Sequence, residues 1–190
     1  MRLLLWRHGR TAWNHLGRFQ GQLDPPLDEV GRAQARAAAP VLAARRPAVI
    51  VASDLERARS TAAVLGALVG VPVRPDERLR EIELGEWSGL TLAEAVARFP
   101  DEHDRWQRGE DVRRGGGETY AEVAARALAV VEEVCSSLSS LPEPDRIAVL
   151  VTHGGTARAV AGRLRWSCRR RPGGGSGRWA TAGGRRCGST

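Results

Sequence analysis

Short apolar runs alternate with longer segments of mixed polarity along most of this chain. Continuous apolar stretches at residues 3–6, 48–53 and 146–155 predict strands that are buried on both faces. "VPVRP", at residues 71–75, predicts a shorter extended piece. Such runs are typical of parallel strands covered by helices on either side.

The segments between these runs space their apolar residues as helices do. We expect helices at residues 28–46, 55–69, 91–100, 119–138 and 156–164, and a loop at 113–117. Asp28 is a suitable N-cap, and Thr91 with Glu94 forms a capping box. Strands alternating with helices predict an α/β fold, a three-layer α/β/α sandwich with a mostly parallel central sheet. Ligands of such sheets bind beyond the carboxyl ends of the strands.

Two of the predicted strands end in the same way, as "WRHG" and "VTHGG". This pattern puts His8 and His153 at the expected site edge, and Arg7 directly precedes His8. A single histidine at a strand end is more often structural, but the repeated context favours a joint role. Arg57 follows the second strand, where it either reaches the same edge or lies on a solvated helix face. Arginine presents a planar fork of donors to phosphate oxygens, so these residues point to a phosphoryl group.

A proton donor is expected in "RLREIELGEWSG", which contains Glu81, Glu83 and Glu86 among apolar residues and glycines. One of them, partly removed from water, can act as a general acid, and the residues alone leave open which one. "GGGET", at residues 115–119, is either a flexible loop whose amides face an anion or a plain loop. A neutral imidazole can attack phosphorus while cationic side chains stabilise the charge, so no metal and no cofactor are expected.

Six ordered stretches resemble the signatures of one family. They are "RHGRTAWN", "QGQLDPPLDEVGRAQA", "SDLERARSTA", "RLREIELGEWSGLT", "GGGET" and "VTHGG". Together they resemble the histidine phosphatase superfamily, also called phosphoglycerate mutase-like, over residues 2–164. The resemblance implies that His8 is the phosphorylated nucleophile and Glu81 the proton donor. It also implies that Arg7, Arg57 and His153 bind the phosphoryl group.

The resemblance further implies a set of substrate-binding residues. They are Arg7, Asn14, Gln20, Gly21, Arg57, Glu118, Thr119 and Gly154. Glu118 and Thr119 match a lid in the family. Arg10 stands where Glu or Gln is commoner, and we expect it to add a cation beside the site.

The resemblance favours a phosphatase acting on a small phosphorylated metabolite. Mutases of the family carry a longer insertion than the short segment at residues 90–117. The motifs are most similar to an actinobacterial branch, the glucosyl-3-phosphoglycerate phosphatases, and the absence of lysine among 29 basic residues fits a GC-rich source. The alternatives are a 2,3-bisphosphoglycerate-dependent phosphoglycerate mutase and a catalytically inactive protein that binds a phospho-ligand.

Composition and charge limit the other function classes. The chain has 190 residues, of which 42% are hydrophobic and 27% charged, as in an ordinary globular domain. No apolar run is long enough to cross a bilayer, and no signal peptide is recognisable, so we expect a cytoplasmic protein without a membrane partner. The three cysteines form neither a zinc pattern nor a disulfide framework. The sequence leaves a homodimer open.

The net charge of +7 belongs to the last part of the chain. Residues 165–190 contain seven arginines and no acidic residue, so residues 1–164 are formally neutral and predict no nucleic-acid partner. The same segment contains no Leu, Ile or Val. We therefore expect a histidine phosphatase domain at 1–164 and an aberrant Gly/Arg-rich tail at 165–190. The tail is either a basic extension or the product of a frameshift near Leu164, and the frameshift would leave the fold without its last strand.

Overall fold

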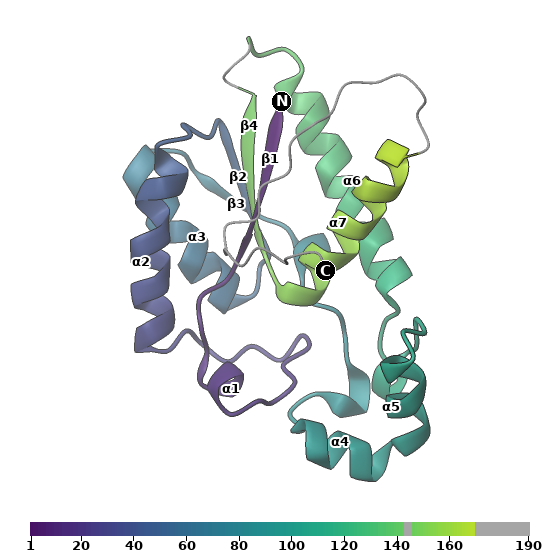
Figure 1. Cartoon of the computed structure of the whole chain (residues 1–190). Helices are drawn as coiled ribbons and strands as arrows, with labels where there is room; N and C mark the ends of the chain where they lie inside the picture. The colour runs from purple at the N-terminus through teal and green to yellow at the C-terminus, as the bar shows by residue number, and fades with distance from the viewer. Residues whose placement is uncertain (143–145, 170–190) are drawn as a thin grey trace, which may run out of the picture.

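A central parallel sheet organises the fold (Figure 1). The computed structural model describes residues 1–142 and 146–169, with side chains up to residue 164. Its strands are β1 (Arg2–Arg7), β2 (Val49–Ala52), β3 (Val73–Pro75) and β4 (Ile147–Thr152), in the spatial order β1-β4-β2-β3. All three strand pairs are parallel, as the apolar runs predict.

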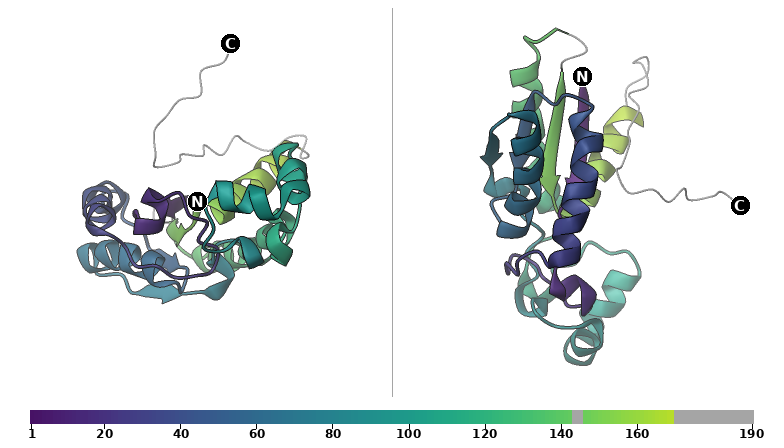
Figure 2. Two further views of the ribbon diagram at one scale, coloured as in Figure 1. Left: turned by 90° about the horizontal axis from the view of Figure 1, so that it is seen from below. Right: turned by 90° about the vertical axis from the view of Figure 1, so that its left-hand side faces the viewer.

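Helices cover both faces of this sheet. The helices are α1 (Ala12–His15), α2 (Glu29–Ala43), α3 (Glu56–Val69), α4 (Leu92–Arg98), α5 (Pro100–Gln107), α6 (Tyr120–Leu138) and α7 (Gly154–Arg169). Three short 3-10 turns are η1 (Glu77–Leu79), η2 (Gly85–Trp87) and η3 (Arg114–Gly116). α2 and α3 lie on one face, and α6 and α7 lie on the other (Figures 1 and 2). The predicted three-layer α/β/α sandwich is thereby confirmed.

Alternate residues of the strands enter two separate cores. In β4, Ala148 and Leu150 pack against α6 and α7, whereas Val149 and Val151 pack against α2 and α3. Successive side chains of a strand point to opposite faces, so a strand covered on both sides must be apolar at every position. This explains why β4 is a continuous apolar run, all six residues of which are buried.

A third apolar cluster builds a small lobe beyond the carboxyl ends of β1 and β4 (Figure 1). Trp87, with none of its surface exposed, is its largest fully buried side chain. Its indole contacts the rings of Phe19, Phe99 and Trp106. α4 and α5 belong to this lobe, which walls the site described below.

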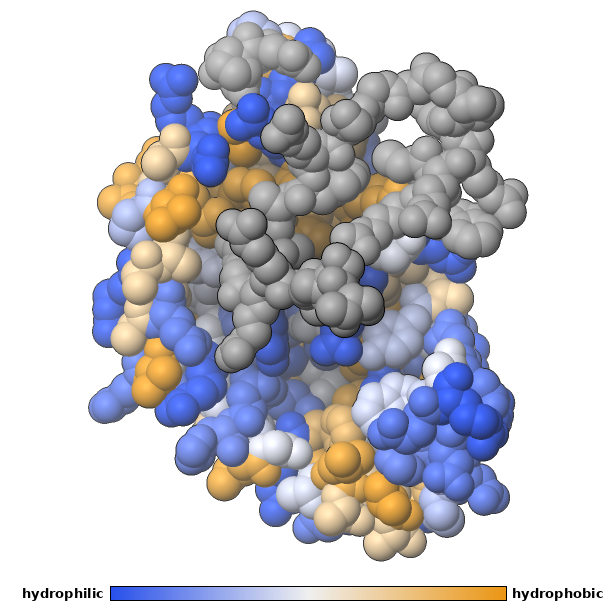
Figure 3. Space-filling model, viewed as in Figure 1, coloured by the Kyte–Doolittle hydropathy of each residue, from blue (hydrophilic) through white to orange (hydrophobic). Residues whose placement is uncertain are grey.

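Most predicted elements are present, with two omissions. The helix caps at Asp28 and Thr91 are confirmed, and the helix expected at residues 91–100 ends at Arg98. The sequence did not reveal α1, which has four residues, or α5, which begins at Pro100. α5 buries no residue completely, so it lacks a clear apolar stripe. Figure 3 shows hydrophilic side chains over α5 at the lower right.

Some expectations concern residues that the structure does not describe. The frameshift hypothesis and the missing last strand depend on residues 170–190 and on side chains beyond residue 164, which lie outside the described part of the chain. Among the helices that are described, none combines the length and apolarity needed to span a bilayer.

Candidate active site

The two strand-end histidines are neighbours in space. β1 and β4 pair in register up to Arg7 and Thr152, so the next residue of each strand is a histidine. The backbone N–H of His8 continues this pairing by donating to the Thr152 carbonyl at 3.0 Å. The two imidazole rings are 5.0 Å apart between centroids, and His8 is only 7% exposed and His153 not at all. The parallel register therefore brings together residues that are far apart in the sequence.

The surroundings of His8 define its tautomer and its charge. Nδ1 lies 2.7 Å from the Gly9 carbonyl oxygen, which can only accept, so Nδ1 carries the proton and Nε2 keeps its lone pair. Burial, the positive charge of Arg57 and, more weakly, that of Arg7 lower the pKa of His8 to about 3, although the bond to Gly9 opposes the shift. His8 is therefore a neutral imidazole near pH 7, the form that can act as a nucleophile.

His153 is held neutral in the same way. Burial is the main cause that lowers its pKa well below the usual value, and the charge of Arg57 and the neighbouring His8 add to it. Neither ring nitrogen has a hydrogen-bond partner among the described residues. Buried polar atoms are nearly always bonded, so these nitrogens are available to a ligand.

Arg57 is anchored by the loop that follows α1. Its Nη1 donates to the Leu23 carbonyl at 2.7 Å and to Asp24 at 3.2 Å, and its Nη2 donates to the Gly21 carbonyl at 2.9 Å. Asp24 also accepts from the Glu56 N–H at 2.7 Å, which ties the loop to the first turn of α3. The third nitrogen of the guanidinium, Nε, is buried and has no partner among the described residues. A fixed guanidinium with a free donor suits an anion.

The structure distinguishes the three candidate acids. The Glu81 carboxylate accepts from the N–H groups of Gly155 and Thr156, both at 3.0 Å, in the first turn of α7. This turn follows His153 directly, and Glu81 lines the same cavity as His8. Glu83 instead accepts hydrogen bonds within its own segment, and Glu86 is exposed. Of the three, only Glu81 lines the cavity.

A cavity of about 310 Å³ joins most of the predicted residues. Its lining includes Arg7, His8, Asn14, Gln20, Gly21, Arg57 and Glu81. Its other side chains include Arg18, Phe19, Trp106, Arg114, Tyr120 and Arg158, which were not predicted from the sequence. These six belong to connecting segments or helix surfaces, where nothing in the periodicity separates a lining residue from an ordinary surface residue. A weak signal is that Arg114 immediately precedes three glycines.

Four predicted residues are not part of the cavity lining. His153 and Gly154 lie directly behind it, next to His8 and Arg7. Glu118 accepts from the Glu83 N–H at 2.9 Å and pairs with Arg126 at 2.8 Å. Thr119 caps α6. A substrate-binding role for these four residues stays a prediction.

Arg10 does not supply the cation expected beside the site. Its Nε pairs with Asp28 at 2.7 Å, at the N-cap of α2, and it is not part of the cavity lining. The positive charge of Arg10 is therefore paired with the carboxylate of Asp28. Arg114 and Arg158, from distant parts of the chain, are cations that do line the cavity.

The glycine-rich loop is a close packing contact and not an open set of amides. The N–H of Gly115 donates to Glu102, and that of Gly117 donates to the Arg114 carbonyl. Gly115 has a φ of +57°, and a Cβ there would lie 2.6 Å from the nitrogens of Glu86 and Trp87. Gly115 is thus needed because the loop touches the η2 backbone there.

In residues 1–142 and 146–164, no three or more His, Cys, Asp or Glu side chains are grouped so that they could hold a metal ion.

Comparison with known proteins agrees with this geometry. The family model described as histidine phosphatase superfamily (branch 1) matches residues 3–168. The chain belongs to this superfamily. A glucosyl-3-phosphoglycerate phosphatase of Mycobacterium tuberculosis is 46% identical over 166 residues, which are 86% of this chain and 74% of that protein. A metal-independent phosphoserine phosphatase of Arabidopsis thaliana is 33% identical over 166 residues, covering 85% of this chain and 68% of that one.

Solved structures of this superfamily share the fold. A mycobacterial glucosyl-3-phosphoglycerate phosphatase in complex with VO3 has a TM-score of 0.78 at 47% identity, covering 85% of this chain and 80% of that chain. The expectation of a histidine phosphatase, a phosphoric monoester hydrolase with an α/β fold, is confirmed, and the mutase alternative is not favoured.

Proposed function

We propose that this histidine phosphatase hydrolyses a small phosphomonoester in two steps through a phosphohistidine at His8. The observation that carries the proposal is the state of His8: a buried neutral imidazole whose Nδ1 is anchored, on a cavity that also contains Arg57 and Glu81. An imidazole held in this tautomer presents Nε2 to phosphorus without first losing a proton.

In the first step, Nε2 of His8 attacks phosphorus and the bond to the ester oxygen breaks. Glu81 donates a proton to the departing alkoxide, which leaves as an alcohol. Arg7 and the free Nε of Arg57 stabilise the charge on the phosphoryl oxygens. A ring nitrogen of His153 adds a further hydrogen bond to one of these oxygens.

In the second step, water attacks the phosphohistidine. The Glu81 carboxylate takes a proton from that water, the bond between nitrogen and phosphorus breaks, and inorganic phosphate leaves. His8 returns to its neutral form and Glu81 to its protonated form, which closes the cycle without a redox partner. Arg7 and Arg57 supply the charge stabilisation that a metal could otherwise give, so the proposed mechanism is metal-free. We expect EDTA to leave turnover unchanged, and inhibition that added metal reverses would contradict the metal-free mechanism.

For the substrate, we propose glucosyl-3-phosphoglycerate. The support is the 46% identity to the mycobacterial phosphatase named for it. Relatives named phosphoserine phosphatases are less similar, at 33% and 36% identity. Substrate contacts from Asn14, Gln20 and Gly21 are part of the proposal, since these residues line the cavity. A cytoplasmic location and a homodimer stay predictions, and light scattering tests the dimer.

The test combines a substrate panel with trapping of the intermediate. Wild-type protein is offered phosphorylated metabolites, glucosyl-3-phosphoglycerate included, and quenched during turnover to recover an acid-labile phosphoenzyme. His8→Ala should form no phosphoenzyme, whereas His15→Ala, which removes an exposed histidine outside the cavity, should form it as the wild type does.

Two outcomes would overturn the proposal. If 2,3-bisphosphoglycerate supports isomerisation of phosphoglycerate faster than hydrolysis, the chain is a mutase. If phospho-ligands bind without forming a phosphoenzyme, the chain is a binding protein.

A further inference from the structure

Arg114 carries a buried charge that has no partner in the described part of the chain. The residue is 4% exposed, yet its Nε and Nη2 are buried without a hydrogen bond. No ion pair to Arg114 occurs among residues 1–142 and 146–164. A buried cation without hydrogen bonds is unfavourable, so such groups are usually paired or completed by a ligand.

The backbone around Arg114 holds it in place. Arg114 opens η3, and the Gly115 backbone that follows touches η2 closely. The Glu102 carboxylate in this region accepts from the Gly115 N–H and makes no hydrogen bond with Arg114. Arg114 is therefore positioned by the main chain, and it lines the cavity that also contains His8.

Two aromatic rings cover the guanidinium. Its Cζ lies 5.3 Å from the centroid of Trp106 and 5.2 Å from that of Tyr120. Such cation–π contacts offset part of the cost of burial but offer no hydrogen-bond acceptor. Stacking uses the faces of the guanidinium, and Nε and Nη2, which form one edge of it, have no hydrogen-bond partner among the described residues. This edge is the one that binds a carboxylate through two parallel hydrogen bonds.

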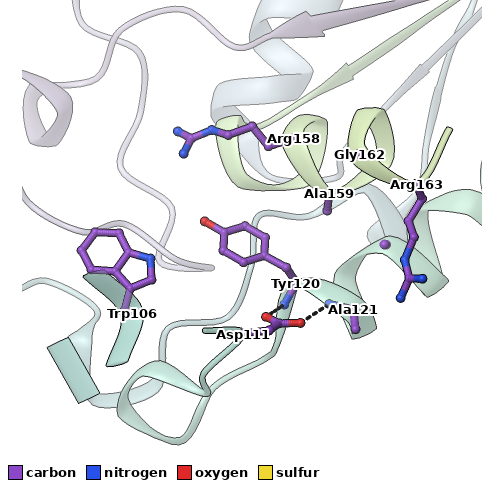
Figure 4. Close-up of a pocket in the computed structure, with 9 residues that line it drawn as sticks. Trp106, Asp111, Tyr120, Ala121, Arg158, Ala159, Gly162 and Arg163 are labelled. Carbon is purple, nitrogen blue, oxygen red and sulfur yellow. Dashed lines mark hydrogen bonds between the residues drawn. The ribbon is translucent and has the colours of Figure 1, made fainter. Parts of the chain in front are cut away.

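The same aromatic residues connect the His8 cavity to a second pocket. Trp106, Tyr120 and Arg158 line both, and the second pocket, between α5, α6 and α7, has a volume of about 470 Å³ (Figure 4). In Figure 4 the Tyr120 ring lies beside Trp106 and below Arg158. A phosphomonoester bound at His8 thus has room to extend past Arg114.

From these observations we infer that Arg114 binds a carboxylate of the substrate and makes the enzyme selective for phosphomonoesters that carry a second acidic group. The inference rests on the proposed function and deepens it. Arg7 and Arg57 hold the phosphoryl group at one end of the cavity, and Arg114 holds the carboxylate at another. An uncharged hydroxyl in place of the carboxylate leaves the guanidinium without a counter-charge.

Two phosphomonoesters that differ only at this group provide the test. 3-Phosphoglycerate and glycerol 3-phosphate share a three-carbon chain, and the second has a hydroxymethyl group in place of the carboxylate. For wild-type protein, we expect kcat/KM to favour 3-phosphoglycerate. Arg114→Gln should reduce that preference on the order of 10- to 100-fold, the effect of losing hydrogen bonds between charged groups. Arg114→Lys, which keeps the charge without the planar fork, should restore part of it.

Arg113→Gln is the matched control, because Arg113 belongs to the same loop but pairs with Glu122 on the surface. It should leave the preference at the wild-type value. If wild-type protein has the same kcat/KM for both substrates, the inference is overturned without any variant. If kcat/KM of Arg114→Gln falls equally for both substrates, the inference is overturned too, because Arg114 then serves the phosphoryl group or the fold.

Direct binding separates this inference from the proposed function. If wild-type protein hydrolyses neither ester nor p-nitrophenyl phosphate, the proposed function fails. Calorimetric titration with 3-phosphoglycerate and glycerol 3-phosphate then decides the inference alone. Tighter binding of the carboxylate that disappears in Arg114→Gln supports it, and equal binding of the two esters refutes it.

Discussion

The depressed pKa of His8 makes the stability of this protein depend on pH in a calculable way. The imidazole titrates near 6.5 in the unfolded chain and at about 3 in the folded protein. As the pH falls below 6.5, the unfolded chain therefore binds a proton at His8 that the folded protein does not bind. Stability from this residue is complete above 6.5 and is lost progressively as the pH falls towards 3. Linkage gives a loss of about 2 kcal/mol between about pH 7.5 and pH 5.0 for His8 alone.

Urea denaturation of the ligand-free protein at these two pH values measures this loss. His8→Gln removes the titrating group, so the variant should lose about 2 kcal/mol less than the wild type between the two conditions. Carboxylates that titrate in this range contribute to both proteins and cancel in the comparison. His15→Gln controls for the removal of an exposed histidine. Equal pH dependence in wild type and His8→Gln would refute the claim that His8 is buried in its neutral form.

Three further substitutions test separate parts of the site. Gly9→Ala should destabilise the fold by about 1–3 kcal/mol, because the new Cβ would lie 2.3 Å from a carbonyl oxygen in α2. Gly162→Ala is the control, since the space around Gly162 is open and the fold should keep its stability. Equal denaturation midpoints for the two variants would contradict this prediction. Asp24→Asn keeps an oxygen that can accept from the Glu56 N–H but removes the ion pair to Arg57, so KM should rise about fivefold. An unchanged KM would exclude a role for Asp24 in positioning Arg57. Glu81→Gln should slow the hydrolysis of alkyl phosphates about 100-fold. The hydrolysis of p-nitrophenyl phosphate should slow much less, since its leaving group needs little protonation. An equal loss of rate for both substrates would count against Glu81 as the acid.

The scaffold of the site could be predicted because its signals are local. The apolar runs of β1 and β4 and the repeated His-Gly ending identify two buried parallel strands and place a histidine at the end of each. A strand covered on both faces buries all of its side chains, so it is apolar throughout and is easily recognised in the sequence. The capping residues Asp28 and Thr91 were equally readable, because a cap acts within one turn of its own helix.

Packing decided what the glycines do. The sequence left open whether the glycines of residues 115–117 form a loop whose amides face an anion or a plain loop. In the structure, Gly115 makes room for η2, and Gly9 makes room for the backbone of Gly31. A glycine in a sequence shows only that a side chain is absent. The neighbour that requires its absence comes from another part of the fold.

The sequence by itself determined the two-sided sheet, the strand-end histidines and the chemistry that they can perform, because these follow from residue type and from spacing along the chain. Only the tertiary structure decided the charges of the site. It pairs Arg10 with Asp28, and it leaves the buried Arg114, which lines the same cavity as His8, without a hydrogen-bond partner among the described residues. Both are arginines in polar stretches, and their local sequences do not show which of the two finds an acidic partner. The electrostatics of a buried group depend on which distant segments surround it and on how much water they exclude, and these are properties of the folded chain.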